Sequence, residues 1–486
     1  MEYSFFRDFF YDVKSSIDKN AVTFVLGPRK CGKTVCLKQL DEVIKNTEYI
    51  DFKHMDENER QENIRRIRSS VFNKESKLYL LDEITYLSAP ELFIYQIADW
   101  YTDVENSTTK IVIAGSQSVA LETWANRAYA GNAGKIKADF LTYSEFLRYK
   151  GIKEISAETY NKFLYETSEF YNIDSLKDYL SGCIDETIIS NANSSNYIQN
   201  NDCELIQNDL HFLVNVCYQT LFTLHNQASV TSFFRDNKLA DSIINYFRDV
   251  CNELEQKDIA DRIQKSFIGS YSTIKSKDIE TLKQALTFLR KCDLIRITPV
   301  SNDIWNVPDV VRDIQSGDRG IGYKAQIFKD YNITIKYPMF YIQILKDILN
   351  EDMPSKLPKQ LLGSIVECHA RGLLPEGFEF RRNEYAEDHS EITKEIDYVN
   401  LSYCIAIELT ISRKHATHFD LLPDYIQPYL LTRDRSDLHG SIKKIPYYYF
   451  LYALSEHSKN LLKMPDHKIL SVFHGLNKQD AHYGHP

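Results

Sequence analysis

The stretch FVLGPRKCGKT, residues 24–34, constrains the fold of this chain more than any other feature. It has the spacing GxxxxGK[ST] and lies between the apolar run AVTFVL and a helical pattern. Glycines let backbone N–H groups curl around phosphate oxygens, and the N-terminus of the following helix adds a favourable dipole. The stretch therefore predicts a phosphate-binding loop between a strand and a helix. Its nucleotide-binding residues are expected to be Gly27, Pro28, Arg29, Lys30, Cys31, Gly32, Lys33, Thr34 and Val35.

Two side chains of this loop have expected roles in phosphate chemistry. Lys33 would reach the β- and γ-phosphates, and the Thr34 hydroxyl would ligate Mg²⁺. Cys31 is expected to fill space, although a thiol exposed to the helix N-terminus would acquire a lowered pKa and become reactive.

A second motif, KLYLLDEI at residues 77–84, reads as a buried strand that ends in Asp82 and Glu83. In a parallel sheet both carboxylates lie at the carboxyl end of the strand, where such folds bind ligands. Asp82 would hold Mg²⁺ through water, and Glu83 would polarise the attacking water as a general base. Together with the loop, this pair predicts nucleotide hydrolysis, with Glu83 and Lys33 as catalytic residues.

Strands and helices alternate along residues 1–150, which predicts an α/β fold with a mostly parallel sheet. Strands are expected at 21–26, 48–52, 77–84 and 110–117, after an amphipathic helix within 1–20. Residues 151–350 read as helical, with a winged-helix-like segment at about 255–310 that ends in a hairpin formed by LIRITPV and IWNVP. Residues 351–486 read as a third, α/β domain. It has a helix at 361–374 and strands near 378–383, 394–400, 403–410 and 447–454, the last being YYYFLYAL.

Composition narrows the function classes. The net charge of −10 excludes bulk attraction to nucleic acid, so contact with DNA requires a local basic surface. The nine cysteines include no CxxC pair, which favours reduced thiols in a cytoplasmic protein. No run approaches 18 consecutive apolar residues, so we expect no transmembrane helix, and the N-terminus does not read as a signal peptide.

The motifs LGPRKCGKTVCLKQL, LYLLDEI, IVIAGSQS and ADFLTYSEFL resemble one family. These are prokaryotic AAA-like P-loop ATPases with a C-terminal restriction-endonuclease-like domain of the PD-(D/E)XK type. ADFLTYSEFL is similar to the family's PLSFxEFL, with Tyr143 in place of Phe, while Cys31 and Val35 depart from GPRRVGKTT. The resemblance implies ATP and Mg²⁺ as cofactors, DNA as a partner and a homo-oligomer that shares arginine fingers. It also implies a γ-phosphate sensor at Ser116 and Gln117, and a sensing or finger arginine at Arg127, which reads equally well as a surface charge.

For the C-terminal domain the resemblance implies two carboxylates and a lysine on a hairpin, with an acidic residue on the preceding helix. Glu367, Asp397 and Glu408 match this pattern, but the expected lysine position is Thr410. Lys414 or Lys394 would have to replace it. Such groups hold divalent metals that stabilise the attacking and leaving oxygens of a phosphodiester.

Three interpretations of these carboxylates stay open: an active nuclease, a nuclease-fold domain that binds without cleaving, and unrelated strands with surface carboxylates. Two functions follow for the whole chain. The first is an ATPase whose cycle controls a nuclease-fold domain that acts on DNA. The alternative is a nucleotide-gated regulatory protein whose inactive nuclease-like domain holds DNA or a partner.

Overall fold

The computed structural model of the chain divides into two compact units. The first comprises Met1–Glu145, Lys177–Asn215 and Lys291–Asp293, and the second comprises Phe146–Leu176, Val216–Arg290 and Leu294–Pro486. The residues that the structure describes are 5–104, 106–115, 118–129, 132–193, 210–223, 228–229, 250, 252–254, 256–277, 279–299, 331–350, 353–354, 356–374, 379–384, 393–400, 405–409, 427–433 and 442–461. The sequence-based division at residues 150 and 350 stays a prediction.

The first unit contains a five-stranded sheet in the order β2-β3-β4-β1-β5. All neighbouring pairs are parallel, which confirms the parallel α/β fold predicted from the strand–helix alternation. The strands are β1 (Val22–Leu26), β2 (Thr47–Asp51), β3 (Leu78–Asp82), β4 (Lys110–Ala114) and β5 (Gly134–Lys137).

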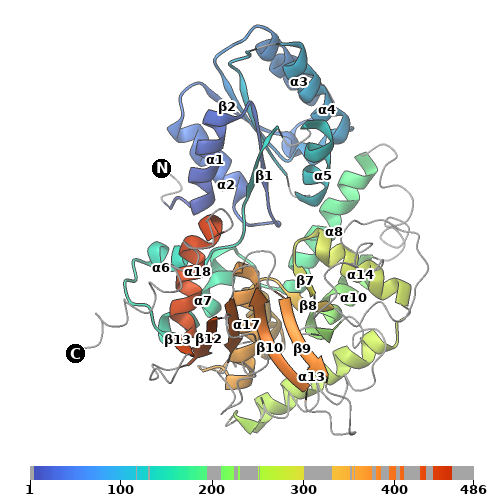
Figure 1. The fold of residues 1–486 in the computed structure, drawn as a ribbon. Helices are drawn as coiled ribbons and strands as arrows, with labels where there is room; N and C mark the ends of the chain where they lie inside the picture. The colour runs from blue at the N-terminus through green and yellow to red at the C-terminus, as the bar shows by residue number, and fades with distance from the viewer. Residues whose placement is uncertain are drawn as a thin grey trace. The chain divides into compact units, whose positions relative to one another are not determined.

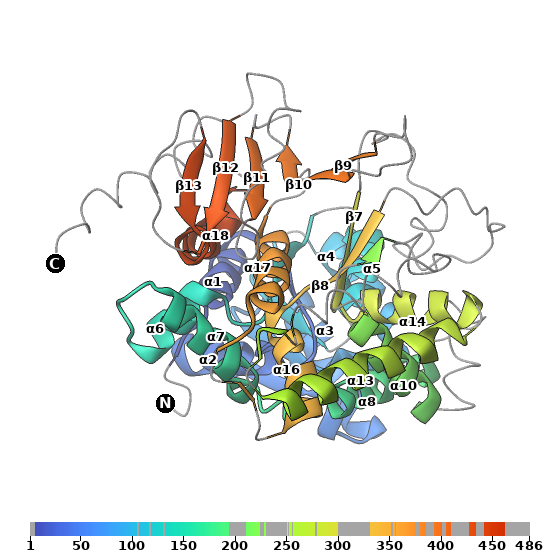
Figure 2. The ribbon, with the colours of Figure 1, turned by 90° about the horizontal axis from the view of Figure 1, so that it is seen from below.

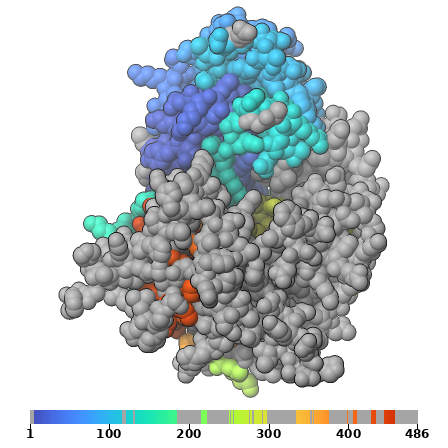
Figure 3. All heavy atoms as spheres, in the orientation of Figure 1, coloured from blue at the N-terminus to red at the C-terminus, as the bar shows by residue number. Residues whose placement is uncertain are grey.

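Helices cover both faces of this sheet (Figure 1). One face packs against α1 (Asp8–Lys19) and α2 (Lys33–Val43), and the other against α3 (Glu57–Phe72), α4 (Pro90–Asp103) and α5 (Ser118–Tyr129). Because helices cover the sheet on both sides, every position of its central strands β1 and β3 is buried, as in parallel sheets generally. Most blue and cyan atoms, which belong to this sheet and its helices, lie together in the space-filling view (Figure 3).

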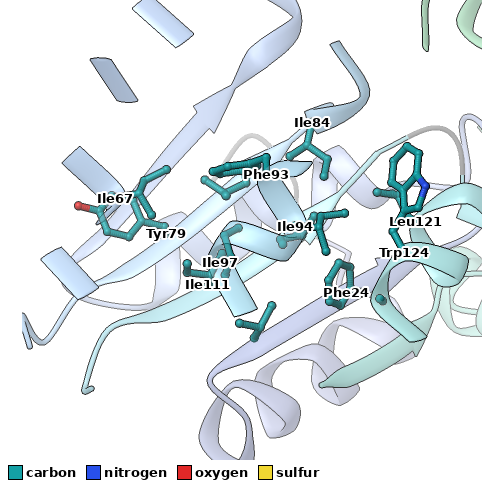
Figure 4. Packing of buried hydrophobic residues seen from close by; sticks show 14 of the residues in the cluster. Phe24, Ile67, Tyr79, Ile84, Phe93, Ile94, Ile97, Ile111, Leu121 and Trp124 are labelled. Atoms are coloured by element: carbon teal, nitrogen blue, oxygen red, sulfur yellow. The ribbon is translucent and has the colours of Figure 1, made fainter. Parts of the chain in front are cut away.

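The core of the first unit forms where alternate strand residues meet α4. Phe24 of β1 and Ile111 of β4 belong to one buried cluster with Ile94 and Ile97 of α4 (Figure 4). Strand side chains alternate between faces, so the intervening residues face α1 and α2. Burial on both faces fixes the register of the strands and thereby the positions of the loops at their carboxyl ends.

The second unit contains a mixed five-stranded sheet in the order β13-β12-β11-β10-β9 (Figure 2). In this sheet, β10 pairs antiparallel with both β9 and β11, and β12 pairs parallel with both β11 and β13. They are β9 (Glu379–Glu384), β10 (Thr393–Asn400), β11 (Ile405–Leu409), β12 (Gln427–Thr432) and β13 (Lys443–Pro446). Before them comes α17 (Lys359–Leu373), so the predicted order of one helix followed by three strands is confirmed.

The strand predicted for YYYFLYAL is wrong, because these residues begin helix α18 (Tyr447–Leu461). Tyr447, Phe450, Leu451 and Leu454 are buried, at the spacing of one helix face. A continuous apolar run does not distinguish a buried strand from a buried helix, and here the intervening tyrosines are partly exposed on the other side of the helix.

The remaining described helices are α6 (Tyr143–Lys150), α7 (Ala157–Phe170), α8 (Leu176–Asn193), α10 (Leu210–Thr223), α13 (Lys257–Lys275), α14 (Ile279–Lys291) and α16 (Pro338–Leu349). After α14, β7 (Ile295–Pro299) pairs antiparallel with β8 (Tyr331–Ile335), which also pairs with the two-residue β6 (Ala228–Ser229). The second strand of the predicted hairpin, IWNVP, lies outside the described residues, so the winged helix stays a prediction. No helix in the described part of the chain is long and apolar enough to cross a bilayer.

Candidate nucleotide-binding site

The loop predicted to bind phosphate connects β1 to α2 at the carboxyl end of the sheet (Figure 1). A Cβ atom at Gly27 would lie 1.8 Å from the Ala138 carbonyl oxygen, so only glycine fits there. Gly32 has a φ of 102°, in the left-handed region that favours glycine, and it immediately precedes α2. The backbone therefore favours glycine at both motif positions for reasons that are independent of any ligand.

Lys33 points its ammonium group back into the loop. Its Nζ donates hydrogen bonds to the carbonyl oxygens of Gly27 (2.7 Å) and Pro28 (2.8 Å). The residue is only 6% exposed although it carries a charge. A phosphate oxygen is a stronger partner for this ammonium than a carbonyl oxygen, because charge-assisted hydrogen bonds between two ions are the stronger ones.

The Asp82 carboxylate ends β3 and lies beside the first turn of α2. It accepts hydrogen bonds from the Thr34 side chain and from the Tyr49 hydroxyl, the latter at 2.9 Å. Burial raises the pKa of Asp82 above its usual value, although both hydrogen bonds act in the opposite direction. The structure thus brings the two predicted metal ligands, Thr34 and Asp82, into direct contact, and oxygen donors of this kind fit Mg²⁺.

Glu83 follows Asp82 with an unusual backbone. Its φ of 51° and ψ of 43° are left-handed, which is uncommon for a residue with a side chain. Its backbone N–H donates to Asp82 Oδ1 at 3.1 Å, and a short 3₁₀ turn, Ile84–Tyr86, begins after it. Strained backbone of this kind clusters at functional sites, so the outlier is consistent with the predicted role of this carboxylate.

The predicted sensor residues are only partly described. Ser116 and Gln117 lie outside the described residues, just beyond the end of β4, which is next to both β1 and β3. Arg127 is exposed on α5, and its Nη1 lies 3.6 Å from Glu91 Oε1. The sensor roles therefore stay predictions.

The Cys31 side chain, within the loop, is fully buried. Burial raises the pKa of its thiol, and the charges of Lys33 and Arg7 only partly oppose this. A thiol that stays protonated is a poor nucleophile, so the structure supports the space-filling interpretation rather than the reactive one.

Sequence reasoning missed the residues that support the loop from other segments. The Tyr179 hydroxyl of α8 donates to the Arg29 carbonyl oxygen at 3.1 Å, and a Cβ atom at Gly182 would lie 2.3 Å from Arg29 Nη1. On the other side, buried Arg7 donates to the Cys31 carbonyl oxygen and pairs with Glu145. The only signal for Arg7 in the sequence was a charge among four phenylalanines, which implies a buried partner.

The second unit brings together the three carboxylates predicted for a nuclease-like site. Glu367 lies on α17, Asp397 on β10 and Glu408 on β11. Burial and the nearby charges of Glu367 and Glu408 raise the pKa of Asp397 well above its usual value. Asp397 Oδ2 also accepts a hydrogen bond from the Leu409 N–H at 2.6 Å.

The cation in this cluster is Arg371 of α17, one helical turn after Glu367. Its Nη2 lies 3.1 Å from Glu367 Oε1, and the side chain is buried. Thr410 and Lys414 lie outside the described residues. Lys394 lies on β10, but its side chain is outside the described part of the structure. Within the described ranges, no three His, Cys, Asp or Glu side chains are close enough together to hold a metal ion.

Comparisons with known proteins bear mainly on the N-terminal region. No curated protein matches the chain. Among solved structures, a Walker-type ATPase of Pyrococcus abyssi is 15% identical, with a TM-score of 0.31 over 61% of this chain and 91% of that chain. DnaA of Aquifex aeolicus bound to AMPPCP is also 15% identical (TM-score 0.27; 58% and 92% covered). ORC1 of Aeropyrum pernix in complex with DNA is 12% identical (TM-score 0.22; 71% and 91% covered).

At these identities and TM-scores the similarity assigns no shared activity to this chain. The match to a protein family is more specific, because it coincides with the loop and the Asp82–Glu83 strand described above. Residues 19–147 match the family model described as an AAA domain, so the N-terminal region of this chain is a P-loop domain of the AAA ATPase type.

Proposed function

We propose that the N-terminal region binds ATP with Mg²⁺ and hydrolyses its γ-phosphate. The observation that carries this proposal is the contact between Thr34 and Asp82, next to the buried ammonium of Lys33. Two oxygen ligands and one cation thus converge at the carboxyl ends of β1 and β3, where parallel sheets bind ligands.

The protein groups have distinct roles in this reaction. Lys33 exchanges the Gly27 and Pro28 carbonyl oxygens for oxygens of the β- and γ-phosphates. The Thr34 hydroxyl and the Asp82 carboxylate would hold Mg²⁺. Bound Mg²⁺ supplies neutralisation of the charge that develops on the phosphate oxygens.

Glu83 orients and polarises the water that attacks the γ-phosphate. This role is supported by its position immediately after Asp82 and by its left-handed backbone. A carboxylate at this place accepts a proton from water while the donors of the loop stabilise the leaving charge.

Single substitutions test these roles. Lys33→Ala is expected to abolish ATP turnover, and Glu83→Gln to retain binding of ATP while hydrolysis stops. Lys45→Ala and Glu42→Gln are matched controls, because both residues are exposed at or beyond the C-terminal half of α2. Hydrolysis by Glu83→Gln at the parental rate would show that Glu83 is not the base.

For the second unit, the first candidate is a nuclease-fold domain that acts on DNA under control of the ATP cycle. It is supported by the charges of Glu367 and Glu408 near Asp397, on a helix and two antiparallel strands, although the three carboxylates are not close enough together in the structure to hold a metal ion. The alternative is a domain that binds DNA or a partner without cleaving. It is supported by Arg371, whose guanidinium pairs with Glu367 and so competes with a metal ion for that carboxylate.

A plasmid assay separates the two candidates. The protein is incubated with supercoiled DNA and Mg²⁺ or Mn²⁺, with and without ATP, beside Asp397→Ala and Glu408→Ala. Cleavage that both substitutions abolish supports the nuclease. DNA retention without cleavage by the parental protein supports the binding domain, and cleavage that survives both substitutions removes the nuclease assignment from these carboxylates.

A further inference from the structure

A buried arginine outside the phosphate-loop motif joins three segments of the first unit. Arg7 donates from Nε and Nη2 to the two carboxylate oxygens of Glu145, each at 2.9 Å. Nη2 also donates to the Asp139 carbonyl oxygen at 3.0 Å, and Nη1 donates to the Cys31 carbonyl oxygen at 3.2 Å. The guanidinium thus connects the loop to the segment 138–145, whose backbone also lies against Gly27.

The partner carboxylate is itself fixed in place. Glu145 accepts hydrogen bonds from the backbone N–H groups of Asp8 (2.8 Å) and Thr142 (3.0 Å). Burial alone would raise the pKa of Glu145, but the charge and hydrogen bonds of Arg7 and these N–H groups lower the pKa to about 2. Glu145 is therefore ionised at neutral pH and neutralises the charge of Arg7.

The contact with Cys31 has a consequence for the loop backbone. The Cys31 carbonyl and the Gly32 N–H belong to one peptide group, and in a trans peptide these two bonds point in opposite directions. A carbonyl held toward Arg7 therefore directs the Gly32 N–H away from Arg7. Gly32 immediately precedes α2, at the place where backbone N–H groups of a helix N-terminus bind phosphate.

We propose that Arg7 is a positioning residue of the phosphate loop, which holds the Cys31 carbonyl so that the Gly32 N–H faces the bound phosphates. This inference rests on the proposed nucleotide binding and adds a requirement to it. Arg7 acts through the geometry of the loop rather than through its charge, because Glu145 neutralises that charge.

Two variants of the full-length protein separate geometry from charge. Arg7→Lys keeps the positive charge, but an ammonium cannot reproduce the planar fork that reaches Glu145, Asp139 and Cys31 together. Glu145→Gln removes the negative charge and replaces one of the two acceptor oxygens with an NH₂ donor. If Arg7 acts through charge, Glu145→Gln strengthens ADP binding, and if it acts through geometry, both variants weaken ADP binding.

The measurement is titration calorimetry with ADP and with ATP, on variants that circular dichroism shows to be folded. We expect Arg7→Lys to weaken ADP binding by about tenfold or more, the size of a lost charge-assisted hydrogen bond. Lys77→Met is the control, because it breaks the ion pair with Glu48 at the amino end of β3, away from the loop. Glu145→Asp replaces either variant that does not fold, since it keeps the charge and withdraws the carboxylate from Arg7.

Amide hydrogen exchange at residues 27–34 without nucleotide gives a second, independent measurement. Exchange that is faster in Arg7→Lys than in Lys77→Met supports the proposal, and equal rates overturn it. The proposal is also overturned if Arg7→Lys binds ADP as tightly as the parental protein does, or if Glu145→Gln binds ADP more tightly. No ADP binding by the parental protein instead overturns the proposed function, and hydrogen exchange then decides whether Arg7 orders the loop.

Discussion

Asp82 shows how a single residue can serve binding at the expense of stability. Its carboxylate is only 1% exposed, and burial raises its pKa, which means that the folded protein holds a proton more tightly than the unfolded chain does. A carboxyl group with a raised pKa stabilises the fold only at low pH, and this contribution is lost as the pH rises through the folded-state pKa. Above its folded-state pKa, the ionised Asp82 carboxylate therefore costs stability.

Asp82→Asn should for this reason stabilise the protein without metal while it abolishes Mg²⁺-dependent hydrolysis. The amide keeps the shape of the side chain and removes the buried charge. We expect the Tm at pH 7.5 to rise by ~2–4 °C, as for about 1 kcal/mol in a domain of this size. Scanning calorimetry in EDTA measures the change. A lower Tm would show that the buried charge of Asp82 does not destabilise the fold.

Tyr49 is a second residue whose role can be tested by removing one atom. Its hydroxyl donates to Asp82 Oδ2, so Tyr49→Phe is expected to raise the Mg²⁺ concentration for half-maximal hydrolysis by about 3–10-fold, the usual worth of one hydrogen bond. Affinity for ADP without Mg²⁺ should not change. Tyr101→Phe is the control, because its hydroxyl donates to the Thr109 carbonyl oxygen before β4 begins. An unchanged Mg²⁺ requirement would exclude a role for the Tyr49 hydroxyl.

At the residue scale, the sequence predicted what lies within one short motif. Lys33 and Thr34 are neighbours, and Asp82 and Glu83 end one apolar strand, so spacing alone identified them. Tyr49 and Glu145 were missed because they reach their partners across 33 and 138 residues. Contacts at such separations depend on the order of strands in the sheet, which no local pattern encodes.

At the scale of elements, α17 and α18 show a different limit. The amphipathic pattern of α17 was sufficient to predict a helix, whereas the apolar run of α18 was interpreted as a strand. The difference arises from tertiary contacts, since Tyr447 of α18 packs edge-on against Tyr160 of α7 with ring centroids 5.4 Å apart. Tyrosines also occupy the partly exposed side of α18, so its sequence is apolar on both sides and shows no clear helical period.

The packing of α17 against α7 predicts a pH dependence of stability. The buried His369 of α17 lies 3.0 Å from the Tyr160 hydroxyl, and burial lowers its pKa to about 3. Between pH 6.5 and 3 the unfolded chain binds a proton at this residue and the folded protein does not, so stability falls as the pH falls. Lowering the pH from 7.5 to 5.5 should cost about 1 kcal/mol at this residue.

His369→Gln tests this expectation, because it keeps a hydrogen-bonding group for Tyr160 without a titrating ring. Urea unfolding of both proteins at pH 7.5 and 5.5 gives the free energies. The parental protein should lose about 1 kcal/mol more than the variant on acidification. Equal losses would mean that His369 also accepts a proton in the folded state.

At the scale of the whole molecule, the first unit is not a continuous piece of chain. It includes Lys177–Asn215, and the α8 residues Tyr179, Leu180 and Ile184 are buried. Tyr179 packs against Phe140 with ring centroids 6.4 Å apart and donates to the loop at Arg29. Part of the support for the nucleotide loop therefore comes from α8, beyond residue 147, where the match to the AAA domain ends.

A comparison of fragments tests this arrangement. Residues 1–150 should have a Tm at least ~5 °C below that of residues 1–193, because the loss of one large buried side chain costs about 3 kcal/mol. ADP affinity should fall in parallel. Tyr179→Ala in the longer fragment measures how much of the difference comes from this one side chain. Equal stability of the two fragments would show that α8 contributes nothing to the fold of the first unit.

The ion pair between Arg7 and Glu145 also sets an order of events during translation. Arg7 leaves the ribosome early, whereas its partner follows 138 residues later, a delay of roughly 7–28 s at ~5–20 residues per second. Until then a nascent chain already carries the whole GPRKCGKT stretch but not the carboxylate that completes its support. A growing polypeptide would thus become competent for ATP only after the entire sheet has been synthesised.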